Sequence, residues 1–155
     1  ASIMLHDMLR RILRNMDLSE NEIDESIYDA MLLSVDVAHA LHPNKKEKMD
    51  ITNMPVMGKG FCIKQACSQS YATDAQAIAI LCQLCDEKGI PYQRFVNRSD
   101  SRGGSTLGSI AGTLLPVKTV DIGIPILAMH SACELMGVRD MKALSDCVTA
   151  FFGYH

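Results

Sequence analysis

The chain has 155 residues, a hydrophobic fraction of 48% and a formal net charge of -3 at pH 7. This length suits one domain with a single core, and the apolar fraction excludes a disordered chain. Because there is no basic excess, neither a nucleic acid nor an anionic membrane is indicated as a partner, and no run approaches the ~20 apolar residues that span a bilayer.

The cysteines are interpreted as thiols rather than disulfides. A chain this large and apolar does not need cross-links to fold. Cys82 and Cys85 form a C-x-x-C motif inside a helical pattern, with no second pair at the spacing of a zinc ribbon. A thiol-redox role for this pair is the alternative. Free thiols, together with an N-terminus that lacks the basic start and apolar core of a signal peptide, predict a cytoplasmic location.

The first elements are predicted to be helices. Residues 2–16 place apolar side chains at helical spacing on one face. This pattern predicts a helix that faces the core, with a membrane-surface helix as the alternative. Ser19 and Glu22 have the spacing of a capping box, so a short helix is expected from about 20 to 28.

An apolar run that ends in a carboxylate follows these helices. The run 31–35 does not alternate with polar residues, which predicts a strand buried on both faces and ending at Asp36. Residues 43–55 are polar and are expected to form a functional or interface loop. A second strand is expected at 61–64, after a Gly-Lys-Gly turn.

The rest of the chain alternates between strands and helices. Thr73 and Gln76 form the next capping box, and the helix that they open is expected to end at about Lys88, before Gly89. The later elements are a strand at 92–96, a polar glycine-rich loop at 97–106, a helix at about 105–115, a strand at 117–122 stopped by 123–125, a helix opened by Ser131 and Glu134, and a last helix at about 139–152. This order predicts an α/β fold, a mostly parallel sheet flanked by helices.

Asp36 and His130 are the candidate metal ligands. Each follows an apolar strand, and ligands of open α/β sheets gather outside the carboxyl ends of the strands. A carboxylate and an imidazole are typical zinc ligands, but a catalytic zinc takes about three from the protein. The alternatives are that Asp36 caps backbone amides and that His130 is a hydrogen-bonded core histidine.

Other polar residues are candidates for binding. His39 and His42 would share a face if their segment were helical, but Pro43 favours irregular structure, so a metal pair and a substrate-polarising role both stay open. The loop 97–106 suits an anion or is only a tight turn. Lys64 is interpreted either as a solvated lysine or as a positive charge for an acidic group.

Taken together, the chain resembles the aspartyl aminopeptidase family, which includes the vacuolar aminopeptidase I type. The segments that carry the resemblance are, in order, SVDVAHALHPN at 34–44, IK at 63–64, YATD at 71–74, FVNRSD at 95–100, GGSTLG at 103–108, VDIGIP at 120–125 and MHS at 129–131. They run over most of the chain in the order of the family.

The resemblance implies a dinuclear zinc exopeptidase with two Zn²⁺ ions in each complete active site. Asp36 would bind one metal and His130 the other, while His42 would assist catalysis or assembly. Lys64 would face the acidic side chain of an N-terminal Asp or Glu of a peptide substrate. The remaining substrate-binding residues are expected to be His39, Gly103, Gly104 and Ser105. A homo-oligomer, a dodecamer in the full-length family, is also implied.

The resemblance also implies that residues 1–155 are the C-terminal part of a split zinc-exopeptidase catalytic domain with a phosphorylase/hydrolase-like fold. The catalytic glutamate and the aspartate that bridges the metals would lie upstream, and the inserted β domain of the family would be absent. The expected function is therefore a zinc-dependent aminopeptidase of which this chain is an inactive fragment. The alternative is a non-catalytic α/β interaction module that keeps the scaffold.

Overall fold

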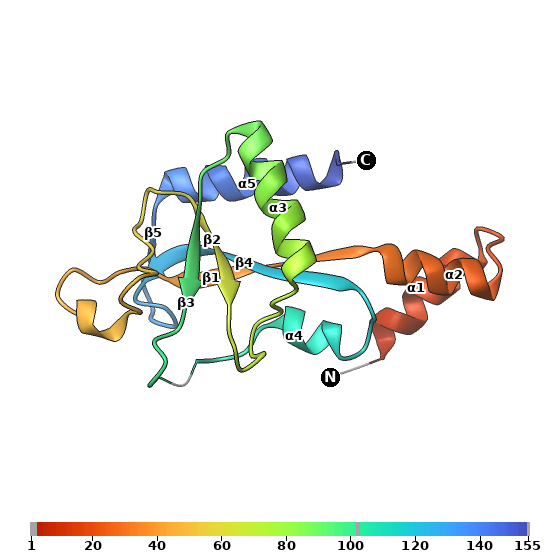
Figure 1. Ribbon diagram of the computed structural model, residues 1–155, viewed down its shortest axis with the longest axis horizontal. Coiled ribbons are helices and arrows are strands. Elements are labelled where there is room, and N and C mark those ends of the chain that lie inside the picture. Colours follow the sequence, from red (N-terminus) through yellow and green to blue (C-terminus); the bar gives the residue numbers. More distant parts are fainter. Residues whose placement is uncertain (1–2, 102, 155) are drawn as a thin grey trace.

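The computed structural model describes residues 3–101 and 103–154, and Figure 1 shows their arrangement around one sheet. The helices are α1 (Met4–Arg14), α2 (Glu20–Asp29), α3 (Ala75–Lys88), α4 (Leu107–Gly112) and α5 (Val138–Phe152), with a 3-10 turn η1 (Lys46–Lys48). The strands are β1 (Met31–His39), β2 (Phe61–Gln65), β3 (Tyr92–Val96), β4 (Lys118–Leu127) and β5 (Leu135–Met136).

The sheet is mixed, and the prediction of a mostly parallel sheet is wrong in its centre. The strand order is β1-β4-β2-β3, with β5 pairing with the far end of β4. The pairs β1·β4 and β2·β3 are parallel, whereas β2·β4 and β4·β5 are antiparallel. Parallel neighbours need a crossover connection, and α3 supplies one between β2 and β3. The segment 40–60 carries only η1, so β2 enters the sheet in the opposite direction.

The strand β4 continues past the Gly-Ile-Pro sequence that was expected to stop it. The carbonyl of Ile126 accepts a hydrogen bond from Ala40, which continues the β1 side of the sheet. Backbone groups alternate in direction along a strand, so the nitrogen of Pro125 points to the opposite side. There it falls between the residues that pair with β2 and those that pair with β5. The missing amide hydrogen of Pro125 therefore interrupts no ladder bond.

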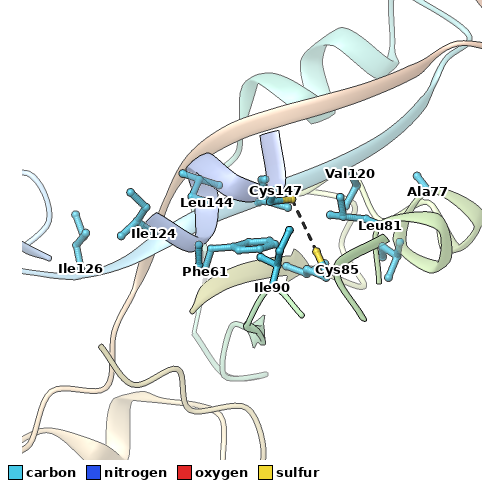
Figure 2. Close-up of a cluster of buried hydrophobic side chains, with 14 residues drawn as sticks. Phe61, Ala77, Leu81, Cys85, Ile90, Val120, Ile124, Ile126, Leu144 and Cys147 are labelled. Atoms are coloured by element: carbon cyan, nitrogen blue, oxygen red, sulfur yellow. Dashed lines mark hydrogen bonds between the residues drawn. The ribbon is translucent and has the colours of Figure 1, made fainter. Parts of the chain in front are cut away.

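One face of the sheet is covered by α3 and α5 (Figure 1). The buried cluster on this face contains Phe61, Ile63, Val120, Ile122, Ile124 and Ile126 from the strands and Ala77, Leu81, Cys85, Leu144 and Cys147 from the two helices. Figure 2 shows these side chains between the layers. Both strands are buried along nearly their whole length, and every second side chain of β2 and β4 faces the two helices and forms the main core.

The thiols of Cys85 and Cys147 meet inside this core, with their sulfur atoms 3.9 Å apart (Figure 2). The contact with Cys147, together with burial, raises the pKa of the Cys85 thiol well above its ordinary value. Reactive cysteines need the opposite shift, toward the thiolate. The interpretation of the C-x-x-C as ordinary packed thiols is therefore supported over a redox role.

Two predicted helices differ in the structure. The helix expected at 105–115 is only α4, Leu107–Gly112. The pair Ser131 and Glu134 opens no helix, because the Glu134 carboxylate accepts a hydrogen bond from the backbone of His130, 2.6 Å away, and the chain turns back into β5. The capping-box spacing is local, and here the pairing of β5 with β4 overrides it.

The prediction that the first helix faces the core is wrong for most of its apolar side chains. Leu9 and Leu13 of α1 pack against a small cluster formed with α2. Met8 and Ile12 are each 50% exposed, and no residue of α1 is fully buried. In Figure 1 the pair α1 and α2 projects beyond the end of the sheet. Within residues 3–101 and 103–154, no helix is long and apolar enough to cross a membrane.

Candidate functional site

The candidate metal ligands lie toward the carboxyl ends of the neighbouring strands β1 and β4. Because β1 and β4 are parallel, their carboxyl ends meet, and His39 pairs in register with Ile126. Asp36 pairs with Gly123 and lies inside β1 rather than at its end, since the strand continues to His39. The Asp36 side chain is half exposed, with 49% of its surface accessible. It caps no backbone amide among the described residues, so the capping interpretation receives no support.

Lys64 is buried, and the interpretation as a solvated lysine is wrong. Its Nζ donates to the carbonyl of Val37 at 2.9 Å and lies 3.4 Å from Oδ2 of Asp36. The same ammonium group lies 4.7 Å from the ring centroid of Tyr71. A buried ammonium must be paired or hydrogen-bonded, and these three contacts satisfy that requirement. The charge of Lys64 is thus held directly beside the Asp36 carboxylate.

His130 follows the end of β4 in an unusual backbone conformation. Its φ angle is 68°, and that of Ala128 is 57°, so both lie in the left-handed region that non-glycine residues seldom adopt. The His130 side chain is exposed, which contradicts the alternative of a core histidine. Partial burial, the charge of His130 and the charge of Lys64, in that order, lower the pKa of His39. His39 therefore lies close enough to both of these groups for them to affect its pKa.

His39 and His42 do not form a metal pair on a common helical face. His39 ends β1 and its ring lies 6.5 Å from that of Phe95. His42 lies in the following loop, where its Nδ1 accepts a hydrogen bond from the amide of Asn44 at 3.1 Å. Nothing in residues 3–101 and 103–154 brings three histidine, cysteine or acidic side chains together to hold a metal. Asp36 and His130 fall short of the three ligands of a catalytic zinc, so this set by itself does not fit one.

A cavity of about 620 Å³ opens beside these residues. Its lining includes His39, His42, Gly103, Gly104, Tyr71 and Phe95. Ser105 instead lines a neighbouring cavity of about 670 Å³, together with the same two glycines. Asp36, Lys64 and His130 line neither cavity. The structure thus brings most of the predicted substrate-binding residues together but leaves the candidate metal ligands next to the cavity rather than in its wall.

Asp121 is a buried acid that the sequence interpretation did not single out, and it lines neither cavity. Its Oδ2 accepts hydrogen bonds from the amide of Ala72 and the hydroxyl of Thr106, both at 2.6 Å. Its Oδ1 has no partner among the described residues. The hydroxyl of Thr106 is directed at Asp121, and the Thr106 side chain forms no capping hydrogen bond with α4. The sequence signal for Asp121 was a single carboxylate inside an apolar strand. A carboxylate that is buried in this way is expected to accept hydrogen bonds from nearby groups.

Tyr71 is the second residue that was missed. The side chain of Asn97 donates to its hydroxyl at 3.0 Å, while its ring covers Lys64. A Cβ atom at Gly103 would lie 2.1 Å from the Asn97 amide nitrogen, so a larger residue there would displace the Asn97 side chain from its contact with Tyr71. Asn97 and Gly103 thus lie close to each other and to the hydroxyl of Tyr71.

Comparisons with known proteins agree on one family. The family model described as aminopeptidase I zinc metalloprotease (M18) matches residues 1–152. A probable M18 family aminopeptidase 2 from Clostridium novyi is 47% identical over 139 residues, which are 90% of this chain and 32% of that protein. The protein of the same description from Clostridium acetobutylicum is 44% identical over 151 residues, 97% of this chain and 35% of that protein.

Solved structures give the same result for the fold. A chain in the Ape4 and Nbr1 complex matches with a TM-score of 0.92 and 34% identity, over 97% of this chain and 29% of that one. The mApe1 dodecamer from S. cerevisiae matches with a TM-score of 0.73 and 26% identity, over 84% of this chain and 28% of that one. The chain therefore spans about a third of the length of the proteins it matches.

Proposed function

Because this chain belongs to the aminopeptidase I zinc metalloprotease (M18) family, we propose that it forms part of a zinc-dependent aminopeptidase that removes N-terminal residues from peptides. Asp36 and His130 would each contribute one ligand to a zinc site completed by residues outside these 155. The observation that carries this proposal is the parallel pairing of β1 with β4. Because of this pairing, the strand of Asp36 and the segment leading to His130 run toward the same end of the sheet.

The proposed substrates are peptides with an acidic N-terminal residue. Lys64 would face that side chain, and its ammonium group is already desolvated, since only 3% of the residue is exposed. A desolvated charge binds a carboxylate more strongly than one in water does. The contact with Asp36 would compete with such a ligand until a metal takes the Asp36 carboxylate.

The proposal is tested most directly with a chimera. The 155-residue chain would replace the corresponding third of the Clostridium novyi relative, and under this proposal the rest of that protein would supply the remaining ligands. We expect the purified chimera to contain zinc and to hydrolyse an aspartyl substrate, and the chain alone to do neither. Asp36→Asn and His130→Gln in the chimera should reduce both zinc content and turnover, whereas Asp146→Asn, in an exposed ion pair on α5, and His6→Gln serve as matched controls.

Three outcomes would contradict the proposal. A folded chimera that keeps its zinc and its activity without Asp36 and His130 would remove their assigned role. Hydrolysis by the 155-residue chain alone would show that no further residues are needed. A folded chimera with zinc but no turnover would favour the alternative, a non-catalytic α/β interaction module. The mass of the chimera in solution also tests whether it forms a homo-oligomer, as the mApe1 dodecamer does.

A further inference from the structure

The cavity next to the candidate site has a cationic wall. Besides the residues named above, Lys45, Lys48 and Arg98 line it. No aspartate or glutamate of the described residues contributes to the lining. Phe95, Tyr71 and Met129 supply apolar surface beneath these charges. A pocket of this composition favours an anionic group carried on a short organic chain.

The three cations of this wall differ in how far they are already paired. Arg98 donates to the backbone carbonyl of Glu47, and its Nε lies 2.7 Å from the Asp100 carboxylate. It therefore joins the loop after β3 to the loop after β1 across the cavity. Lys45 is only loosely paired with Glu47, at 3.7 Å, and both side chains are exposed. Lys48 makes no ion pair with any residue in the described ranges. The ammonium groups of Lys45 and Lys48 are thus available to bind an anionic ligand.

This wall is distinct from the site of Lys64. The Lys64 ammonium group is directed at Val37 and Asp36 and does not line the cavity. A carboxylate that reaches Lys64 would therefore not also occupy the cavity. An aminopeptidase substrate has no residues before its N-terminus, so any additional side chain bound nearby must come from a later residue of the peptide.

We propose that the cavity is a second anion subsite, in which Lys45 and Lys48 bind a carboxylate side chain downstream of the N-terminal residue and Arg98 holds the two loops in place. This inference rests on the proposed aminopeptidase function, because that function defines which end of the peptide lies at Lys64. Exposed ion pairs contribute modestly, so each lysine is expected to change peptide affinity by about two- to five-fold at low salt.

The first test measures binding to the 155-residue chain, without catalysis. Calorimetry at low ionic strength would compare the peptides Ala-Glu-Ala and Ala-Gln-Ala. We expect tighter binding of the glutamyl peptide, and loss of that difference in the double variant Lys45→Gln, Lys48→Gln. Lys46→Gln is the matched control, since Lys46 lies in η1 between them but does not line the cavity. Equal binding of the two peptides, or an equal loss in Lys46→Gln, would overturn the subsite.

The second test uses the chimera and separates this inference from the proposed function. The ratio of kcat/KM for substrates with glutamate and glutamine at the second position should fall in the double lysine variant and be retained in Lys46→Gln. An active chimera with an unchanged ratio would refute the subsite and leave the function intact. An inactive chimera whose peptide binding still depends on Lys45 and Lys48 would refute the function and leave the anion site.

Discussion

Gly108 of α4 packs tightly against the buried acid Asp121. A Cβ atom at this position would lie 2.7 Å from Oδ1 of Asp121 and 2.8 Å from Cβ of Ser34. Both neighbours are held by the sheet, so neither can move without breaking the contacts of Asp121. We expect Gly108→Ala to lower the free energy of unfolding by about 1–3 kcal/mol, as overpacking does in cores. Urea denaturation measures this change.

Gly104→Ala provides the control for this prediction, because nothing lies within 4 Å of a Cβ at that position. It should leave the free energy of unfolding within about 0.5 kcal/mol of the parent, as surface substitutions do. Equal effects of the two substitutions would show that the close approach of Gly108 to Asp121 is not what requires a glycine.

At the level of single elements, α1 and α2 are joined by charges at the surface. Glu20 contacts both Arg10 and Arg14, with Oε1 of Glu20 2.8 Å from Nε of Arg14. The hydrogen bond from Arg14, followed by that from Arg10, lowers the pKa of Glu20 from 4.5 to about 2. A lowered carboxyl pKa means that the stabilisation is fully present above about pH 4.5 and is lost as the pH falls toward 2.

This shift predicts that α1 loosens from α2 in acid before the sheet unfolds. Amide exchange in α1, measured by mass spectrometry, should accelerate between about pH 4.5 and pH 2 after correction for the intrinsic rate. In Glu20→Gln the exchange should be fast throughout that window. Glu25→Gln should behave like the parent, because Glu25 lies on the same helix but forms no ion pair with any residue that the structure describes. An unchanged pH dependence in Glu20→Gln would contradict the assignment.

The elements that the sequence predicted correctly are those with local signals. Ser19 and Glu22 form the expected capping box, and Gly89 ends α3 in the left-handed conformation. The pair at 131–134 has the same spacing, yet it forms a turn because β5 pairs with β4. The same limit applies to the site. The contacts of Asp121 with Ala72 and Thr106 join residues far apart in the chain, which no local pattern reveals.

On the scale of the whole molecule, two surfaces are unusual for a soluble domain. One is the outer edge of β1, a nine-residue strand at the end of the sheet order. The other is the apolar side of α1, where Met8 and Ile12 are each 50% exposed. Long strand edges and contiguous apolar patches both favour association. We therefore expect the 155-residue chain to self-associate as its concentration rises.

Sedimentation velocity tests this expectation. The double variant Met8→Lys, Ile12→Lys should shift the chain toward monomer, because two charges would be desolvated in any contact of α1. Val138→Lys is the control, since Val138 is an apolar side chain that is 83% exposed and lies at the start of α5 rather than on α1. A chain that stays monomeric at all concentrations, or an effect of Val138→Lys as large as that of the double variant, would contradict a role for α1.

The left-handed backbone of His130 makes this position a costly one for a residue other than glycine. A non-glycine residue in that conformation costs roughly 1–2 kcal/mol, and asparagine tolerates it better than most residues. The backbone amide that contacts Glu134 would persist in His130→Asn. We expect that variant to be at least as thermally stable as the parent, which differential scanning calorimetry can determine. That result would show that the fold does not need the His130 imidazole, as is expected of a side chain that we propose to bind zinc.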